Sequence, residues 1–158
     1  MTPTSEGWSN ELSRRHRTAM IFVIGFLILD IVLLLIAYLA ADRLFSPRDP
    51  SLTMALWIAI LIFGLGAFVL RRTRFAPMRL KDIAALKGAA GLLKTLQDTT
   101  LQIACIGGAI ALMGFMLVIL NGDWTYMLRA AGVSAIVLIY CYPFRNAWER
   151  AARQLSSN

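Results

Sequence analysis

Four long apolar stretches separated by charged segments constrain this chain more than any other feature of its sequence. They are Ala19–Ala41, Ser51–Leu70, Leu101–Leu120 and Thr125–Phe144. An α-helix rises about 1.5 Å per residue, so roughly 20 apolar residues cross a hydrocarbon core about 30 Å thick. Apolar residues make up 58% of the chain. The sequence therefore predicts an all-α integral membrane protein with four transmembrane helices.

Charged and turn-forming segments divide the chain into three parts. We expect a cytoplasmic N-terminal segment over 1–18, a transmembrane domain over 19–144 and a basic cytoplasmic tail over 145–158. The connections Ser46–Pro50 and Asn121–Asp123 are short and rich in residues that end helices or form turns. They predict two antiparallel helical hairpins. The first apolar stretch has 23 residues, which is longer than the core of a signal peptide (about 7–15 residues), so we expect a retained helix.

The distribution of basic residues predicts the orientation. Three arginines precede the first stretch, seven Lys or Arg residues lie between the second and third, and three arginines follow the fourth, whereas the other side carries three arginines. The positive-inside rule then places both termini in the cytoplasm, as in a bacterial inner (plasma) membrane protein. The net charge of +7 is typical of some nucleic-acid binders. Here the basic residues flank the apolar stretches, so we expect no nucleic-acid partner.

The segment 78–99, between the second and third stretches, has the pattern of an amphipathic helix. Its apolar residues form one wide arc at 100° per residue. We expect its basic residues to contact anionic lipid headgroups; they are Arg79, Lys81, Lys87 and Lys94. Docking of this helix on the bundle or on a partner protein stays open. Gly88 and Gly91 weaken a helix, so two shorter helices are also open.

Asp30 is the residue with the sharpest functional question, because it is the twelfth of the 23 residues in the first stretch. Ionisable groups at this depth are costly and often functional. Counting residues from the two short turns places Gly64, Gly114 and Ser134 at the same depth. Three interpretations follow: a neutral Asp30 that holds helices together with Ser134, a proton or cation site formed by Asp30, Ser134 and Gly64, or a carboxyl that faces lipid.

A faint internal similarity relates the two halves of the chain. Ile21–Gly25 resembles Ile103–Gly107, and Thr53–Leu56 resembles Thr125–Leu128. A duplicated hairpin would produce this pattern, with the copies related by an axis along the membrane normal. Apolar segments also match by chance, so both explanations stay open.

The sequence offers no catalytic constellation, and we expect no catalytic residues, no metal site and no cofactor. Cys105 and Cys141 are both predicted near the cytoplasmic end of the second hairpin, as reduced packing residues. We therefore expect a non-enzymatic accessory, assembly or scaffold protein that contacts membrane lipids and either a membrane-protein partner or further copies of itself. The alternative is a small oligomeric transporter of protons or cations that uses Asp30.

Overall fold

The computed structural model describes residues 5–46, 50–74 and 77–142. Four helices occupy these ranges: α1 (Ser5–Leu44), α2 (Pro50–Arg74), α3 (Pro77–Asn121) and α4 (Thr125–Tyr140). The all-helical fold predicted from the sequence is confirmed. Three segments are long and apolar enough to cross a membrane: Ser13–Ala41, Pro50–Arg74 and Lys94–Asn121.

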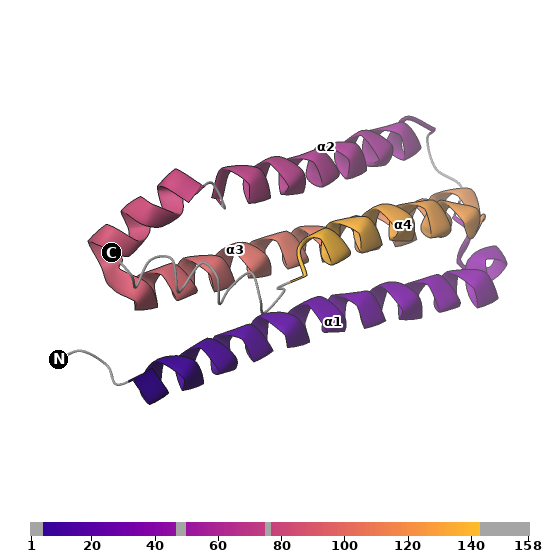
Figure 1. Cartoon of the computed structure of the whole chain (residues 1–158). Helices are drawn as coiled ribbons and strands as arrows, with labels where there is room; N and C mark the ends of the chain where they lie inside the picture. The colour runs from indigo at the N-terminus through magenta and orange to yellow at the C-terminus, as the bar shows by residue number, and fades with distance from the viewer. Residues whose placement is uncertain (1–4, 47–49, 75–76, 143–158) are drawn as a thin grey trace.

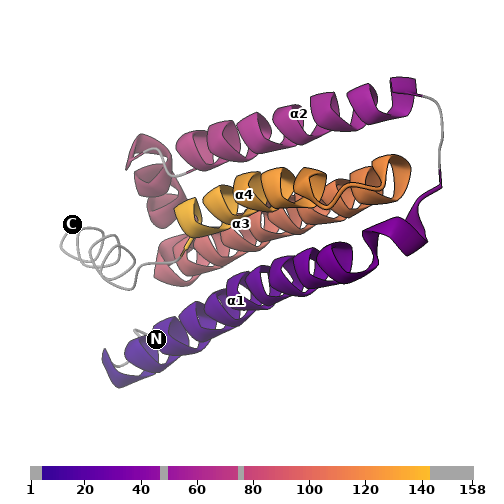
Figure 2. The same ribbon diagram turned by 90° about the vertical axis from the view of Figure 1, so that its right-hand side faces the viewer.

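α3 is the central helix of the bundle. Figures 1 and 2 show α1 and α2 on opposite sides of the layer formed by α3 and α4. α3 packs against each of the other three helices, whereas α1 and α2 make no extensive contact with each other. Although α1 and α2 are joined by a short connection, they are therefore separated in space by the second pair of helices.

Two adjacent rows of side chains on α3 explain its central position. Ile103, Ile110 and Leu117 lie seven residues apart and pack in a cluster with α2 and α4. Ala104, Ala111 and Val118 repeat at the same interval, one position further along, and pack toward α1 and α4. A seven-residue repeat keeps one row facing one neighbour along nearly straight helices. Two such rows let α3 pack on both sides.

The predicted amphipathic segment 78–99 and the third apolar stretch form one continuous helix of 45 residues, α3. Thr99 and Thr100, at the expected junction, are buried, and their hydroxyls donate to the carbonyls of Thr95 and Leu96. The helix is not interrupted at this junction, because the threonine hydroxyls bond to carbonyls of the preceding turn within the helix. In Figure 1 the first turns of α3 lie at an angle to the remainder.

α4 is the shortest helix, with 16 residues. It ends at Tyr140, before the predicted boundary at Phe144, and Phe144 lies outside the described residues. At the other end, Gly122 adopts a positive φ of 70° between α3 and α4. The Asp123 carboxylate then accepts hydrogen bonds from the backbone N–H and the hydroxyl of Thr125, the first residue of α4, at 2.9 and 2.7 Å. One of the unpaired backbone N–H groups at the start of α4 is thereby satisfied, although the N-cap residue, Trp124, makes no side-chain cap hydrogen bond.

Hydrogen bonds and ring contacts join all four helices at this turn end of the bundle. The Ser46 N–H, after α1, donates to the carbonyl of Ile119 on α3, 2.8 Å away. Asn121 donates to the hydroxyl of Thr53 on α2, 3.2 Å away. The aromatic pairs Tyr38–Trp124 and Trp57–Tyr126 lie at the same end. These interactions fix the two short connections relative to each other.

Candidate functional site

Asp30 lies in the row of α1 side chains that faces the bundle. The buried residues of this row recur at intervals of three, four or seven positions, as expected for one face of a helix. They are Ala19, Val23, Asp30, Leu33, Ala37 and Ala41. Asp30 is only 4% exposed and lies between Val23 and Ala37 at seven-residue spacing. It occupies a position that a heptad seam normally gives to an apolar residue.

Two contacts define the register between α1 and α3. Arg15 Nη1 lies 3.4 Å from Gln97 Oε1, a pair separated by 82 residues in the sequence. Phe26 packs on Gly108, the same separation, and a Cβ atom at Gly108 would collide with its ring. The two helices are therefore parallel, and this register places Asp30 at the level of Ala111 and Leu112. Small residues on α3 allow the close approach.

Neither oxygen of the Asp30 carboxyl group forms a hydrogen bond with the described residues. Ser134, on α4, is fully buried and lies near this carboxyl. Its hydroxyl nevertheless donates to the carbonyl oxygen of Gly107, 3.0 Å away. A hydroxyl has one proton but can still accept. A neutral Asp30 can thus donate to Ser134, whereas an ionised Asp30 would need a donor that Ser134 has already committed.

The structure brings Asp30 and Ser134 together but places the two predicted glycines elsewhere. Gly114 packs on Ala130 and Met127 of α4. Gly64 faces Val133 in a groove between α2 and α4, and a Cβ atom added at Gly64 would lie 3.5 Å from the Val133 side chain. Counting residues from a turn gives the depth of a residue but not the side of the helix on which it lies. That is why the count did not predict that Gly64 faces Val133.

Gly107 and Gly108 are the residues of this site that the depth argument missed. A Cβ atom at Gly107 would lie 2.8 Å from the side chain of Leu138, so α4 also approaches α3 closely here. Because the two glycines are adjacent, α1 and α4 both approach α3 closely at the same level. The sequence signal was the Gly-Gly pair itself, one helical turn before the buried Ala111.

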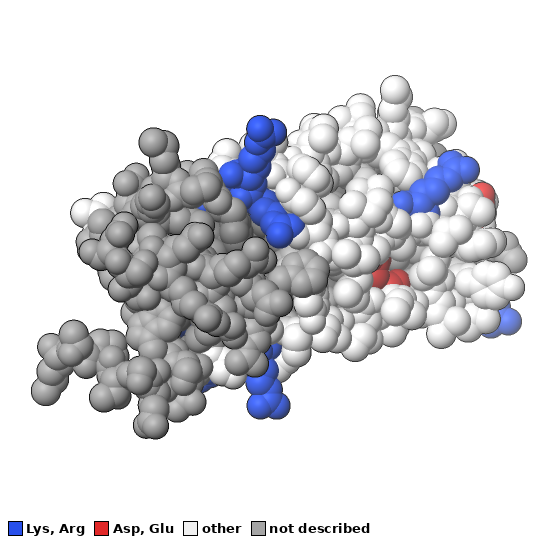
Figure 3. Space-filling model, in the orientation of Figure 1, with Lys and Arg blue, Asp and Glu red and all other residues white. Residues whose placement is uncertain are grey.

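The predicted lipid-contacting residues are only partly described. Lys94 is exposed at the start of the apolar part of α3, while the side chains of Arg79, Lys81 and Lys87 lie outside the described ones. The basic tail, 145–158, also lies outside the described residues. Figure 3 shows Lys and Arg on either side of a broad band that has no basic residues, with a small acidic area within this band.

The last turn of α2 carries three arginines, Arg71, Arg72 and Arg74. Arg71 Cζ lies 4.0 Å from the centre of the Tyr140 ring. The ring of Phe68 stacks on the same Tyr140, with centroids 4.1 Å apart and planes 8° from parallel. A cation and an aromatic ring thus hold Tyr140 at the arginine-rich end of the α2–α4 interface.

Both cysteines are free thiols. Cys141 is buried with Ala67 and Val137, as expected for a packing residue, whereas Cys105 is exposed on α3. Within residues whose side chains are described, no three His, Cys, Asp or Glu residues are grouped so that they could hold a metal ion.

Comparisons of the chain with protein-family models, curated proteins and solved structures give no match. The class of the protein therefore follows from its own structure. Over the residues that the structure describes, it is an all-helical protein of four helices, three of which are long and apolar enough to span a membrane.

Proposed function

We propose that this chain is a small polytopic membrane protein that crosses the bilayer four times, with both termini in the cytoplasm of a bacterial cell. Its 13 basic residues on one side against three on the other support this orientation. α4 alone spans about 24 Å at 1.5 Å per residue, somewhat less than a hydrocarbon core. Local thinning of the bilayer accommodates such a helix at modest cost.

We propose further that it acts as a non-enzymatic accessory, assembly or scaffold protein. The observation that carries this proposal is how little of the two outer helices is buried: 17% of the most apolar part of α1 and 11% of that of α2, against 50% of that of α3. Each outer helix packs through one seam and leaves the rest of its apolar surface uncovered. Lipid or the helices of other membrane proteins would cover these two separate faces.

The setting of Asp30 favours this proposal over transport. Asp30 is 4% exposed on a helix that packs against α3 and α4, and both of its carboxyl oxygens are buried. A transport site needs access for an ion or proton from each side of the membrane in turn. A buried polar group that joins helices needs no such access.

Site-specific photocrosslinking in native membranes tests the scaffold proposal. A photoreactive residue replaces Ile31 on α1 or Leu65 on α2, which are 66% and 68% exposed. The control position is Ile110 on α3, which is fully buried. We expect a discrete protein adduct from at least one outer face and none from the control. Adducts between differently tagged copies identify a homo-oligomer, and the absence of protein adducts at every outer position contradicts the proposal.

The transporter alternative rests on the lack of a hydrogen-bond partner for the Asp30 carboxyl among the described residues. Its test is proton flux into liposomes that contain the purified chain. A transporter requires flux that the Asp30→Asn variant loses while remaining folded. Flux that is absent, or equal in both proteins, removes this alternative.

Reporter fusions test the orientation. Fusions at either terminus and after residue 76 should report the cytoplasm, whereas insertions at 48 and 122 should report the other side. An odd number of crossings contradicts the proposed topology.

A further inference from the structure

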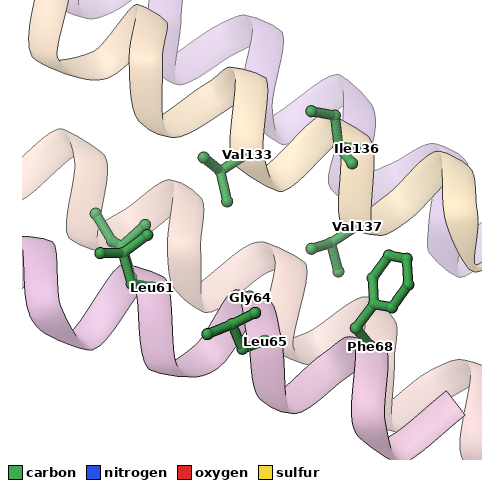
Figure 4. A pocket seen from close by; sticks show the side chains of 8 residues that line it. Leu61, Gly64, Leu65, Phe68, Val133, Ile136 and Val137 are labelled. Carbon is green, nitrogen blue, oxygen red and sulfur yellow. The ribbon is translucent and has the colours of Figure 1, made fainter. Parts of the chain in front are cut away.

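A narrow apolar groove runs along the outside of the bundle between α2 and α4. Its volume is about 220 Å³, and its eight lining residues come from these two helices and are all nonpolar. Figure 4 shows Gly64 between Leu61 and Phe68 on α2, facing Val133 and Val137 on α4. The groove exists at this point because Gly64 contributes no side chain.

The exposure of the lining residues shows that the groove opens to the surroundings of the bundle. Ile60 and Val137 are buried, at 0% and 5% exposure, whereas Leu61, Leu65 and Ile136 are 58–68% exposed. In a membrane these exposed residues contact lipid. The groove is also too small to receive a helix, whose diameter with side chains is about 10–12 Å.

The groove leads toward positive charge. Arg71 lies ten residues beyond Leu61 on the same helix, which is about 15 Å at 1.5 Å per residue, or half of a hydrocarbon core of about 30 Å. The stretch of α2 from the far end of the groove, at Leu61, to Arg71 therefore covers about the depth of one leaflet. The contact with Tyr140 of α4 places Arg71 on the α4 side of α2, over the end of the groove.

We propose that this groove binds one acyl chain of an anionic phospholipid, whose phosphate is held by Arg71. The apolar lining fits a hydrocarbon chain, and the arginine cluster at the end of α2 fits a phosphate. A guanidinium has five N–H donors, so its contact with the Tyr140 ring is compatible with phosphate binding. This inference rests on the membrane insertion proposed above but not on the scaffold role.

Photoreactive lipids test the site in the full-length chain. The chain is placed in phosphatidylcholine nanodiscs that contain a trace of phosphatidylglycerol or phosphatidylcholine with a diazirine in one acyl chain. We expect adducts to concentrate in residues 60–68 and 133–137. The phosphatidylglycerol probe should label these residues about fivefold more than the phosphatidylcholine probe, the preference that roughly one basic side chain near a membrane surface provides.

Two pairs of variants separate the parts of the proposal. Gly64→Leu fills the groove and should reduce labelling there several-fold. The position accepts a Cβ atom without a clash, because this atom would lie 3.5 Å from the Val133 side chain. Gly66→Leu is the control, because nothing lies within 4 Å of a Cβ at that position. Arg71→Gln should remove the preference for phosphatidylglycerol, while Arg72→Gln, an exposed neighbour, should retain most of it.

The outcomes are distinct from those for the scaffold role. Labelling spread evenly around α2, or unchanged by Gly64→Leu, overturns the groove as a lipid site. Equal labelling by the two probes overturns the role of Arg71. Protein crosslinks in native membranes that persist in the Gly64→Leu variant show that a failure concerns the lipid site alone.

Discussion

The hydroxyl of Ser134 donates a 3.0 Å hydrogen bond to the carbonyl oxygen of Gly107 and so joins α4 to α3 beside the buried Asp30. The carbonyl belongs to a helix that already uses it in its own backbone ladder, but a carbonyl oxygen has two lone pairs. The contact requires a close approach of the two helices, and Gly107 permits it.

Removing this hydroxyl should have a small effect. We expect Ser134→Ala to lower the free energy of unfolding by about 1 kcal/mol or less, since hydrogen bonds between membrane helices contribute about 0.6 kcal/mol on average. Asp30→Asn should have a similarly small effect if the carboxyl is neutral. Unfolding in bicelles measures both variants. In a double-mutant cycle, a coupling energy above about 3 kcal/mol between the two positions would instead indicate an ionised, tightly bonded pair.

A methyl group at Gly114 should disturb the packing of α3 on α4. The Cβ of an alanine there would collide with the Cβ of Ala130, so Gly114→Ala should cost about 1–3 kcal/mol of unfolding free energy. Gly132→Ala on α4 is the matched control, because its Cβ would meet nothing within 4 Å. Equal stability of the two variants would show that α3 and α4 are not packed as described.

Gly122 should tolerate no ordinary side chain. Its φ of 70° is unfavourable for residues with a Cβ, at a cost of about 1–2 kcal/mol. A Cβ there would also lie 2.9 Å from the ring of Phe45. We expect Gly122→Ala to be destabilised, and the added Phe45→Ala substitution to relieve the steric part of the loss but not the backbone part. Full recovery in the double variant would mean that the backbone conformation carries no cost.

Stability should depend on pH through Asp123. The Thr125 backbone N–H, followed by the Thr125 hydroxyl, holds the pKa of Asp123 below its usual value of 3.8. A carboxylate with a lowered folded pKa stabilises the protein fully above the unfolded value and loses this contribution as the pH falls through the folded value. The stability difference between wild type and Asp123→Asn should therefore shrink as the pH falls from about 5 to below 3.

A thermal unfolding series over this pH range measures the difference. Thr125→Val is a second variant, because it removes the hydroxyl but keeps the backbone N–H. It should show a smaller pH dependence than wild type. A difference between wild type and Asp123→Asn that is constant with pH would show that the carboxylate does not stabilise the start of α4.

The sequence by itself determined which segments are helical and apolar, and where the chain turns. These properties are local. A run of apolar residues of bilayer length forms a helix wherever it lies, and Pro50, Gly122 and Asp123 interrupt helices through their own backbone preferences and hydrogen bonds. Asp30 and Ser134 were predicted at the same depth because helical rise per residue is constant, and the structure places Ser134 near the Asp30 carboxyl.

Only the tertiary structure decided which helices are neighbours. It placed α3 between α1 and α2, set α1 and α3 parallel with the 82-residue offset that also relates Ile21–Gly25 to Ile103–Gly107, and put Gly64 in a groove away from Asp30. The side of a helix that packs depends on the summed fit of many small contacts between side chains distant in the sequence, such as Phe26 on Gly108. No single residue carries that fit, so reading the residues one segment at a time does not reveal it.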